Sequence, residues 1–135
     1  MNVTEIPFVK HIGIQEQKEI LSLNFEQHLL NHIKTLHASA QFTLAETQSG
    51  LFLQTLFPEL EGKVVPVLRD AQIKYKRPAI EKIFSVASVD EEALKKFKVQ
   101  FEKRGRGSLQ INVEVKDIND VITTQATFTW FIQAL

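Results

Sequence analysis

Alternation between hydrophobic and polar residues marks three segments of the chain as half-buried strands, at residues 21–26, 109–116 and 125–130. Successive side chains of a strand point to opposite faces of its sheet, so a period of two predicts one face toward a core. Residues 64–77 are predicted as a longer strand, with a proline near its start, where a missing N–H is least costly. Residues 80–89 are dense in β-branched side chains and are predicted as another strand.

The segment of residues 38–57 lacks this alternation and is rich in helix-forming residues. Its apolar side chains would point all round a helix rather than along one stripe, which is typical of a helix enclosed by its surroundings. Pro58 would end this helix. A short helical turn is predicted within residues 6–14, and a second helix from Asp90, as its N-cap, to about Phe101.

The order of these elements predicts the architecture. The first strand and the long helix are followed by four strands with hairpin-length connections, one of which carries the second helix and a loop at residues 104–107. Strands joined by short turns predict an antiparallel sheet, and the long helix is the only element large enough to cover its apolar face. We therefore expect a single α+β domain over residues 1–135, with the sheet wrapped around the helix.

Composition narrows the functional classes. Sixteen Lys and Arg balance sixteen Asp and Glu, so there is no basic excess for nucleic acid, and 44% hydrophobic residues exclude a disordered chain. The low net charge leaves little repulsion between copies of the chain. The sequence predicts neither a secretory signal nor a membrane-spanning stretch, and it has no cysteine, which fits a reducing compartment. A soluble, cytoplasmic protein is expected.

Residues that could carry chemistry gather around the start of the long helix. His37 lies six residues after Asn31 and nine before Glu46, which stands in an apolar Leu-Ala-Glu-Thr run, and Thr35 lies between the first two. Downstream, residues 70–79 carry a tyrosine followed by Lys-Arg-Pro. These motifs, in this order, resemble the hotdog-fold acyl-CoA thioesterases of the phenylacetate-pathway and 4-hydroxybenzoyl-CoA type over nearly the whole chain. The resemblance implies a hotdog fold, an antiparallel sheet wrapped around one long central helix.

The resemblance also implies a reaction, the hydrolysis of an acyl-CoA thioester to a free acid and coenzyme A. In this family the acidic residue of the helix, here Glu46, acts as general base or nucleophile. The amide residue, here Asn31, positions water or substrate. The histidine, here His37, polarises the thioester carbonyl together with backbone N–H groups of the first helical residues, here Ala38 and Ser39. No cofactor is implied beyond the coenzyme A of the substrate.

Elementary physical chemistry agrees with these roles. The start of a helix offers free N–H donors and partial positive charge where an oxyanion develops. A carboxylate between apolar neighbours is partly desolvated, which raises its pKa and makes Glu46 a stronger base. Glu46 and His37 are separated by about 13 Å along a helix, so they cannot meet within one chain. In the family a second subunit completes the site, which implies a homodimer or a dimer of dimers.

Two departures from the family pattern favour an alternative. Ala38 and Ser39 stand where the family commonly has Gly-Gly, and residues 67–69 lack the Ser or Thr that often holds the water. The acid is a glutamate, where aspartate is commoner in this subgroup. A branch of uncharacterised thioesterase-like proteins has a similar Thr-x-His-Ala-x-Ala start to the helix. The alternative function is a non-catalytic hotdog protein that binds an acyl-CoA, an acyl chain or an acyl carrier.

Each candidate also has a structural interpretation. Asn31 could make an Asx-turn in a loop, His37 could serve only to begin the helix, and Glu46 could be a solvated helix position. His28 and His32 have the i, i+4 spacing of a metal pair, but no third ligand except His37 is evident, so no metal site is predicted.

Basic residues provide candidates for binding the phosphates of coenzyme A. Arg77 ends one predicted strand, and Arg104 and Arg106 flank a glycine in the later loop. Arginine forks suit phosphate oxygens, so these three residues are the predicted contacts. The alternative is a solvated basic face without a ligand.

Overall fold

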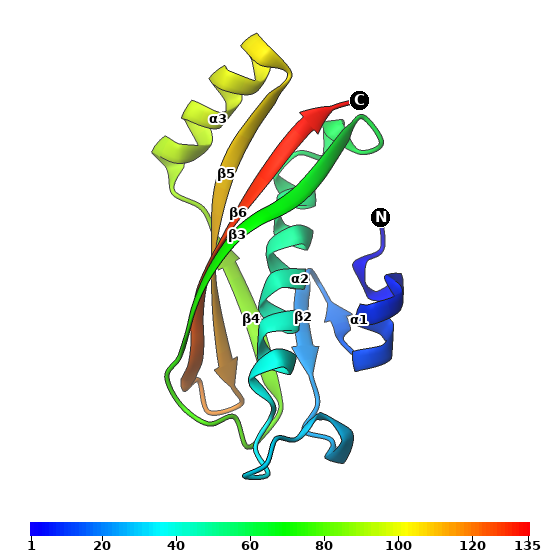
Figure 1. Ribbon diagram of the computed structural model, residues 1–135, viewed down its shortest axis with the longest axis vertical. Coiled ribbons are helices and arrows are strands. Elements are labelled where there is room, and N and C mark those ends of the chain that lie inside the picture. Colours follow the sequence, from blue (N-terminus) through cyan, green and yellow to red (C-terminus); the bar gives the residue numbers. More distant parts are fainter.

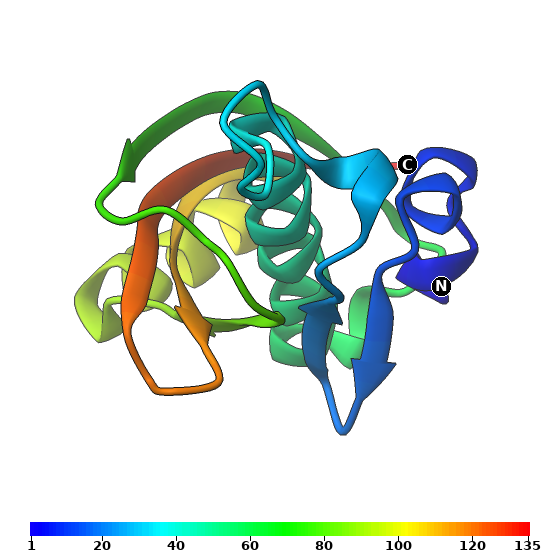
Figure 2. The same ribbon diagram turned by 90° about the horizontal axis from the view of Figure 1, so that it is seen from below.

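The computed structural model describes residues 1–135. It contains one six-stranded antiparallel sheet in the order β1-β2-β4-β5-β6-β3, and the sheet curls around a long central helix (Figures 1 and 2). The strands are β1 Gln15–Gln17, β2 Ile20–Leu23, β3 Val64–Tyr75, β4 Ile83–Ser88, β5 Arg106–Asp117 and β6 Ile122–Ala134, and the α-helices are α1 Pro7–Ile12, α2 Ala38–Leu56 and α3 Glu91–Arg104. Short 3₁₀ turns lie at Val3–Glu5, Gln27–Leu29 and Pro58–Leu60. The predicted hotdog fold is confirmed.

The central helix α2 is buried on several sides, as its apolar pattern predicts, and polar contacts fix its rotation. Gln48 accepts hydrogen bonds from the backbone N–H of Leu21 at 2.9 Å and from the Ser85 hydroxyl at 2.8 Å. Gln41 accepts one from the Thr124 hydroxyl at 2.6 Å. These bonds hold one side of α2 against the sheet. Glu46, two residues before Gln48, lies about 160° round the helix from it and so faces elsewhere.

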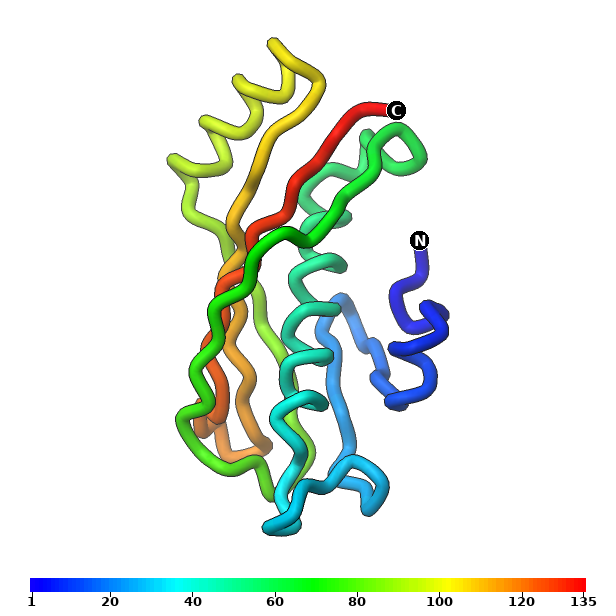
Figure 3. Tube along the Cα trace, viewed as in Figure 1, coloured from blue at the N-terminus to red at the C-terminus, as the bar shows by residue number.

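Strand β3 does not pair with β4, the next strand along the chain, as a series of hairpins would require. It pairs with β6 over its full length and forms one edge of the sheet. From the lower end of β3 the chain crosses past the β5-β6 pair (Figure 3). It then enters β4, which lies on the opposite side of that pair from β3. The register slips between Leu68 and Asp70, which places a bulge at Arg69. Hydrophobic alternation does not specify which strands are neighbours, so the sequence could not predict this crossing.

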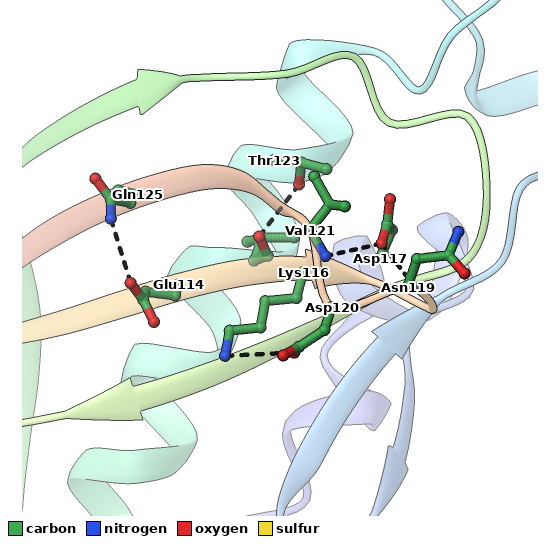
Figure 4. Close-up of polar contacts among 9 residues, drawn as sticks. Glu114, Lys116, Asp117, Asn119, Asp120, Val121, Thr123 and Gln125 are labelled. Atoms are coloured by element: carbon green, nitrogen blue, oxygen red, sulfur yellow. Dashed lines mark hydrogen bonds and ion pairs between the residues drawn. The ribbon is translucent and has the colours of Figure 1, made fainter.

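The loop of residues 76–82 is held at the start of α2. Its Ala79 carbonyl accepts a hydrogen bond from the N–H of Leu36 at 2.9 Å, and Glu81 accepts one from the Asn119 amide at 3.0 Å. Asn119 belongs to the turn between β5 and β6, in which the Asp117 carboxylate accepts two backbone N–H bonds (Figure 4). The loop is therefore anchored both to the sheet and to the chain that enters α2.

Helix α3 begins at the predicted cap, since Asp90 accepts a hydrogen bond from the N–H of Ala93 at 3.0 Å. Its buried Phe97 packs against Phe57, which follows the last residue of α2. The helix runs to Arg104, beyond its predicted end at residue 101. The expected loop at residues 104–107 is shorter than predicted, because Arg106 already pairs with β6.

Strand β1 has no signal in the sequence. Its three residues are polar and exposed, and it exists because a tight turn folds it onto β2. Both turn residues, Lys18 and Glu19, have positive φ angles of 52° and 68°. Non-glycine residues in such a turn carry no recognisable sequence signature. No helix in the structure is long and apolar enough to cross a membrane.

Candidate functional site

Glu46 lies in a cavity of about 590 Å³ that runs beside α2. The N-terminal segment of residues 1–9 forms one wall, the second half of α2 another, and the first residues of β3 with Trp130 and Ile132 of β6 a third. Figure 2 shows this N-terminal segment at the open side of the curled sheet. More than half of the lining residues are hydrophobic, among them the buried Val3 and Val9.

The carboxylate of Glu46 makes no hydrogen bond or ion pair within the chain, although the side chain is about half-buried. Burial raises the pKa of Glu46 above its usual value, because the charged form loses solvent without gaining a partner. The neighbouring hydroxyls are already satisfied, since Thr43 and Thr47 donate to carbonyls of their own helix at 2.8 and 2.6 Å. Glu46 is thus free to accept a proton from a molecule that enters the cavity.

His37 is the N-cap of α2. Its Nδ1 accepts a hydrogen bond from the N–H of Ser39 at 2.9 Å, while the imidazole ring remains exposed. A ring nitrogen that accepts a hydrogen bond carries no proton, so in the neutral ring the proton is on Nε2, which is left as a free donor. The N–H of Ala38 also makes no hydrogen bond within the chain. Of the two backbone donors predicted here, that of Ala38 is available and that of Ser39 is used by the cap.

Asn31 organises a turn, which is the structural interpretation offered for it. Its side-chain oxygen accepts hydrogen bonds from the N–H groups of Ile33 and Thr35, both at 3.0 Å, and its amide donates to the Thr35 hydroxyl at 2.8 Å. One amide hydrogen is left over. Thr35, noted in the sequence only for its spacing, is therefore the partner that orients Asn31.

The predicted residues do not all meet in one chain. Asn31 and His37 both lie in the segment just before α2, but Glu46 lies more than two helical turns further along, about 13 Å from His37. The Glu46 carboxylate and the donors at the start of the helix are therefore separated within one chain.

The arginines lie at two ends of the molecule. Arg77 follows β3 in the loop beside the start of α2, two residues from the Ala79 carbonyl bonded to Leu36. Arg106 pairs with Gln133, which on its other side pairs with Val65 at the opposite end of β3. Ten residues of strand separate Val65 from Tyr75, about 33 Å, so Arg77 and the pair Arg104 and Arg106 of one chain cannot hold the same phosphate. All three arginines are exposed.

Three features of the site have no recognisable sequence signal. Trp130, predicted only as one residue of an alternating strand, is a wall of the cavity, and its indole N–H donates to the Ser49 hydroxyl at 2.9 Å. Gly50 lies opposite this indole. The N-terminal segment forms one wall of the cavity although its sequence predicts only a helical turn. No group of three His, Asp or Glu residues is close enough to hold a metal ion, and His28 lies instead 3.6 Å from Glu26.

Solved structures share this fold. A Pseudomonas aeruginosa protein of unknown function, described as a probable thioesterase, is similar with a TM-score of 0.85 and 22% identity, over 98% of this chain and 91% of that chain. A Bacillus halodurans protein solved with CoA is similar with a TM-score of 0.74 and 16% identity, over 93% of this chain and 74% of that chain. A thioesterase enzyme of Staphylococcus aureus, solved as a glutamine-to-alanine variant, has a TM-score of 0.73 and 16% identity, over 94% of this chain and 98% of that chain.

Sequence comparison adds the family. No curated protein matches the chain. The sequence pattern of a domain of unknown function, DUF4442, matches residues 6–132, nearly the whole chain. The chain therefore belongs to the DUF4442 family.

Proposed function

We propose that this protein hydrolyses an acyl-CoA thioester to a free acid and coenzyme A, with Glu46 as the base. The observation that carries the proposal is the half-buried carboxylate of Glu46, which has no partner in the chain and stands in an apolar cavity beside the central helix of a hotdog fold. Burying a carboxylate without a partner costs stability, so a functional role explains it better than a structural one. The CoA in the similar Bacillus halodurans structure supports the choice of thioester.

The proposed reaction begins when the Glu46 carboxylate takes a proton from a water molecule that attacks the thioester carbonyl carbon. Negative charge develops on the carbonyl oxygen and is met by the free N–H of Ala38 and by Nε2–H of His37. The tetrahedral intermediate then expels the thiolate of coenzyme A, which receives the proton held by Glu46. Direct attack of the carboxylate on the carbonyl, with later hydrolysis of the anhydride, would use the same residues.

This geometry needs two copies of the chain, because Glu46 and the donors of His37 and Ala38 are about 13 Å apart along α2. We propose a homodimer in which α2 of one subunit places its start beside Glu46 of the other. The free edge of β3, twelve residues long, supports this assembly, since an exposed strand edge is a template for pairing. Association of two such dimers is compatible with the same site.

The Staphylococcus aureus thioesterase offers one further support. Its two variant structures replace a glutamate and a glutamine that are fifteen positions apart. Asn31 and Glu46 have the same separation and the same combination of an amide with a carboxylate. We propose that Asn31 acts through its remaining amide hydrogen, with Thr35 holding it in position.

The decisive experiment measures release of free thiol from a panel of acyl-CoA esters by the wild type and by Glu46→Gln. The variant keeps the size of the side chain but removes the base, so turnover should fall by about 10²- to 10⁴-fold. Glu102→Gln is the matched control, because it makes the same change at an exposed position of α3 and should leave turnover unchanged. Wild-type turnover by a folded Glu46→Gln protein would overturn the proposal.

The alternative function is binding of acyl-CoA without hydrolysis. It is favoured by Asn31, three of whose hydrogen-bonding positions are used within its own turn. If calorimetry shows saturable binding of an acyl-CoA to the wild type and no thiol is released, the binding function would be favoured over hydrolysis.

A further inference from the structure

We infer that the cavity beside α2 holds the acyl group of the substrate, and that this group is an alkyl chain of about ten to twelve carbons. The inference rests on the proposed function, because it names the acyl part of the same thioester. It follows from the position of Glu46 within the cavity, from the length and chemistry of the walls, and from one glycine that keeps the cavity open.

The cavity has a reacting position and a long apolar extension. Its lining on α2 extends from Thr43 and Glu46 to Phe57, at the end of the helix. Glu46 and Phe57 are eleven residues apart, about 16 Å along a helix. An extended alkyl chain advances about 1.3 Å per carbon with bonds of about 1.5 Å, so this distance matches about twelve carbons. With the thioester beside Glu46, the chain would run toward the end of α2.

The walls suit a chain that offers no hydrogen bonds. The hydroxyls of Thr43, Thr47 and Thr55 all donate to carbonyls of α2, at distances of 2.6 to 2.8 Å. These hydroxyl protons therefore need no acceptor on a ligand. Val3 and Val9 are almost fully buried where the N-terminal segment closes the opposite wall. A volume of about 590 Å³ is typical of sites that enclose a drug-sized molecule. An acetyl group would leave most of it unfilled.

The far end of the cavity limits how far a longer acyl chain can raise kcat/KM. Glu61 and Gly62 contribute to the lining there and are exposed. A chain that extends past them returns to water, so further methylene groups bury no additional surface. Each methylene up to this point should raise kcat/KM by about fourfold. This ratio corresponds to the free energy of transferring one CH₂ group from water to an apolar environment.

Gly50 sets the width of the cavity. A Cβ atom at this position would lie 3.5 Å from the ring of Trp130, which is ordinary van der Waals contact. The ring cannot easily give way, because its N–H is bound to Ser49, whose hydroxyl in turn donates to the Glu46 carbonyl at 2.6 Å. A larger side chain at residue 50 would therefore occupy the space of the ligand. We assign Gly50 and Trp130 as specificity-determining residues.

The test is a series of saturated acyl-CoA esters from acetyl to hexadecanoyl, with phenylacetyl-CoA included, assayed by thiol release. We expect kcat/KM to rise with chain length and to level off between about ten and twelve carbons, because longer chains leave the cavity. Gly50→Leu should move the maximum to shorter chains. Val86→Ala, which shortens an exposed side chain of β4 outside the cavity, should leave the profile unchanged. A maximum at acetyl-CoA or phenylacetyl-CoA, or the same profile in a folded Gly50→Leu protein, would overturn the inference.

Calorimetry with the inactive Glu46→Gln variant separates this inference from the proposed reaction. Tighter binding of decanoyl-CoA than of acetyl-CoA, lost in Glu46→Gln combined with Gly50→Leu, would support the acyl cavity even if the wild type hydrolysed no ester. Equal binding of the two esters would overturn the acyl cavity even if Glu46 proved to be the base. Melting temperatures of the variants show whether each is folded at the assay temperature.

Discussion

Glu46 combines two properties that oppose each other, since its carboxylate is partly removed from water and yet has no partner in the chain. The sequence already indicated this isolation, because Glu46 is the only charged residue of α2. What the sequence could not indicate was the cavity. Gly50 and Trp130 belong to different elements, and only the pairing of β3 with β6 brings the start of β3 beside them. The isolated carboxylate could be predicted at the scale of one residue, and the cavity around it could not.

The raised pKa of Glu46 predicts a pH dependence with a definite sign. The protonated form is favoured in the folded state, so the contribution of Glu46 to stability is complete below its unfolded pKa of about 4.3 and is lost as pH rises through the raised folded value. The side chain of Glu46→Gln cannot ionise, so this variant does not lose stability as pH rises through that pKa. Its melting temperature should exceed that of the wild type at pH 7, and the difference should vanish near pH 4. Thermal unfolding followed by circular dichroism across this pH range checks the sign.

The same titration should appear in the kinetics. If Glu46 is the base, kcat/KM of the wild type should rise with pH through the same raised pKa. A variant less stable than the wild type at neutral pH, or a rate that falls across this range, would contradict the origin proposed for the shift.

His37 has two roles that a substitution can separate. As N-cap it accepts the Ser39 N–H, and losing such a cap in His37→Ala should cost about 1 kcal/mol of stability. Asparagine is a strong N-cap residue, so His37→Asn should retain most of that stability while removing the Nε2–H donor. We expect both variants to lose turnover and only His37→Ala to lose stability, as measured by denaturant unfolding. Full turnover in His37→Asn would show that the histidine serves the helix alone.

At the scale of elements, the start of α2 and the loop of residues 76–82 form one unit, joined by the bond from Leu36 to Ala79. The sequence predicted the start of α2, but its strands at residues 64–77 and 80–89 left only two residues for this loop. It also could not predict the contact, because β3 and β4 are not neighbours in the sheet. Within one chain, this contact favours Arg77 among the phosphate contacts that we propose. With the acyl chain directed toward the end of α2, coenzyme A should leave toward its start, where Arg77 lies and Arg104 and Arg106 do not.

Arg77→Glu should therefore raise KM for acyl-CoA by about three- to tenfold and leave KM for a short thioester without the nucleotide unchanged. The effect should weaken at high salt, because exposed charges are screened over about 8 Å at physiological ionic strength. Arg106→Glu, the matched substitution at the other end of the sheet, should have little effect on either substrate. Equal changes in KM for the two substrates would show that Arg77 contacts no phosphate.

The packing of elements makes a separate prediction at two glycines. A Cβ at Gly107 of β5 would lie 2.9 Å from the Gln100 side chain and 3.1 Å from the buried ring of Phe97, both on α3. Gly107→Ala should therefore destabilise the protein by about 1–3 kcal/mol, the usual range for overpacking. In Gly50→Ala the added Cβ would contact only Trp130, at 3.5 Å, and alanine has a higher helix propensity than glycine. This variant should therefore be more stable than the wild type by up to about 1 kcal/mol. Denaturant midpoints of the two variants should move in opposite directions.

At the scale of the whole molecule, the sheet and its helix follow from patterns of period two and from the all-round apolar pattern of α2. The strand order does not, because alternation is the same whichever neighbour a strand has. That order leaves β3 as an edge and brings the N-terminal segment, α2 and β3 around one cavity. The length of α2 between them keeps Glu46 and His37 apart in each chain. The proposed chemistry is consequently a property of two chains.

Heterodimers with tagged subunits test this directly. If each site uses Glu46 of one subunit and His37 of the other, a dimer with Glu46→Gln on one chain and His37→Ala on its partner keeps one intact site and about half the wild-type rate. A dimer with both substitutions on one chain and none on the other has both sites damaged and should be far less active. If each site lay within one chain, the two results would be exchanged. Light scattering should first show a dimer at micromolar concentration, and a monomer that hydrolyses acyl-CoA would rule out the shared site.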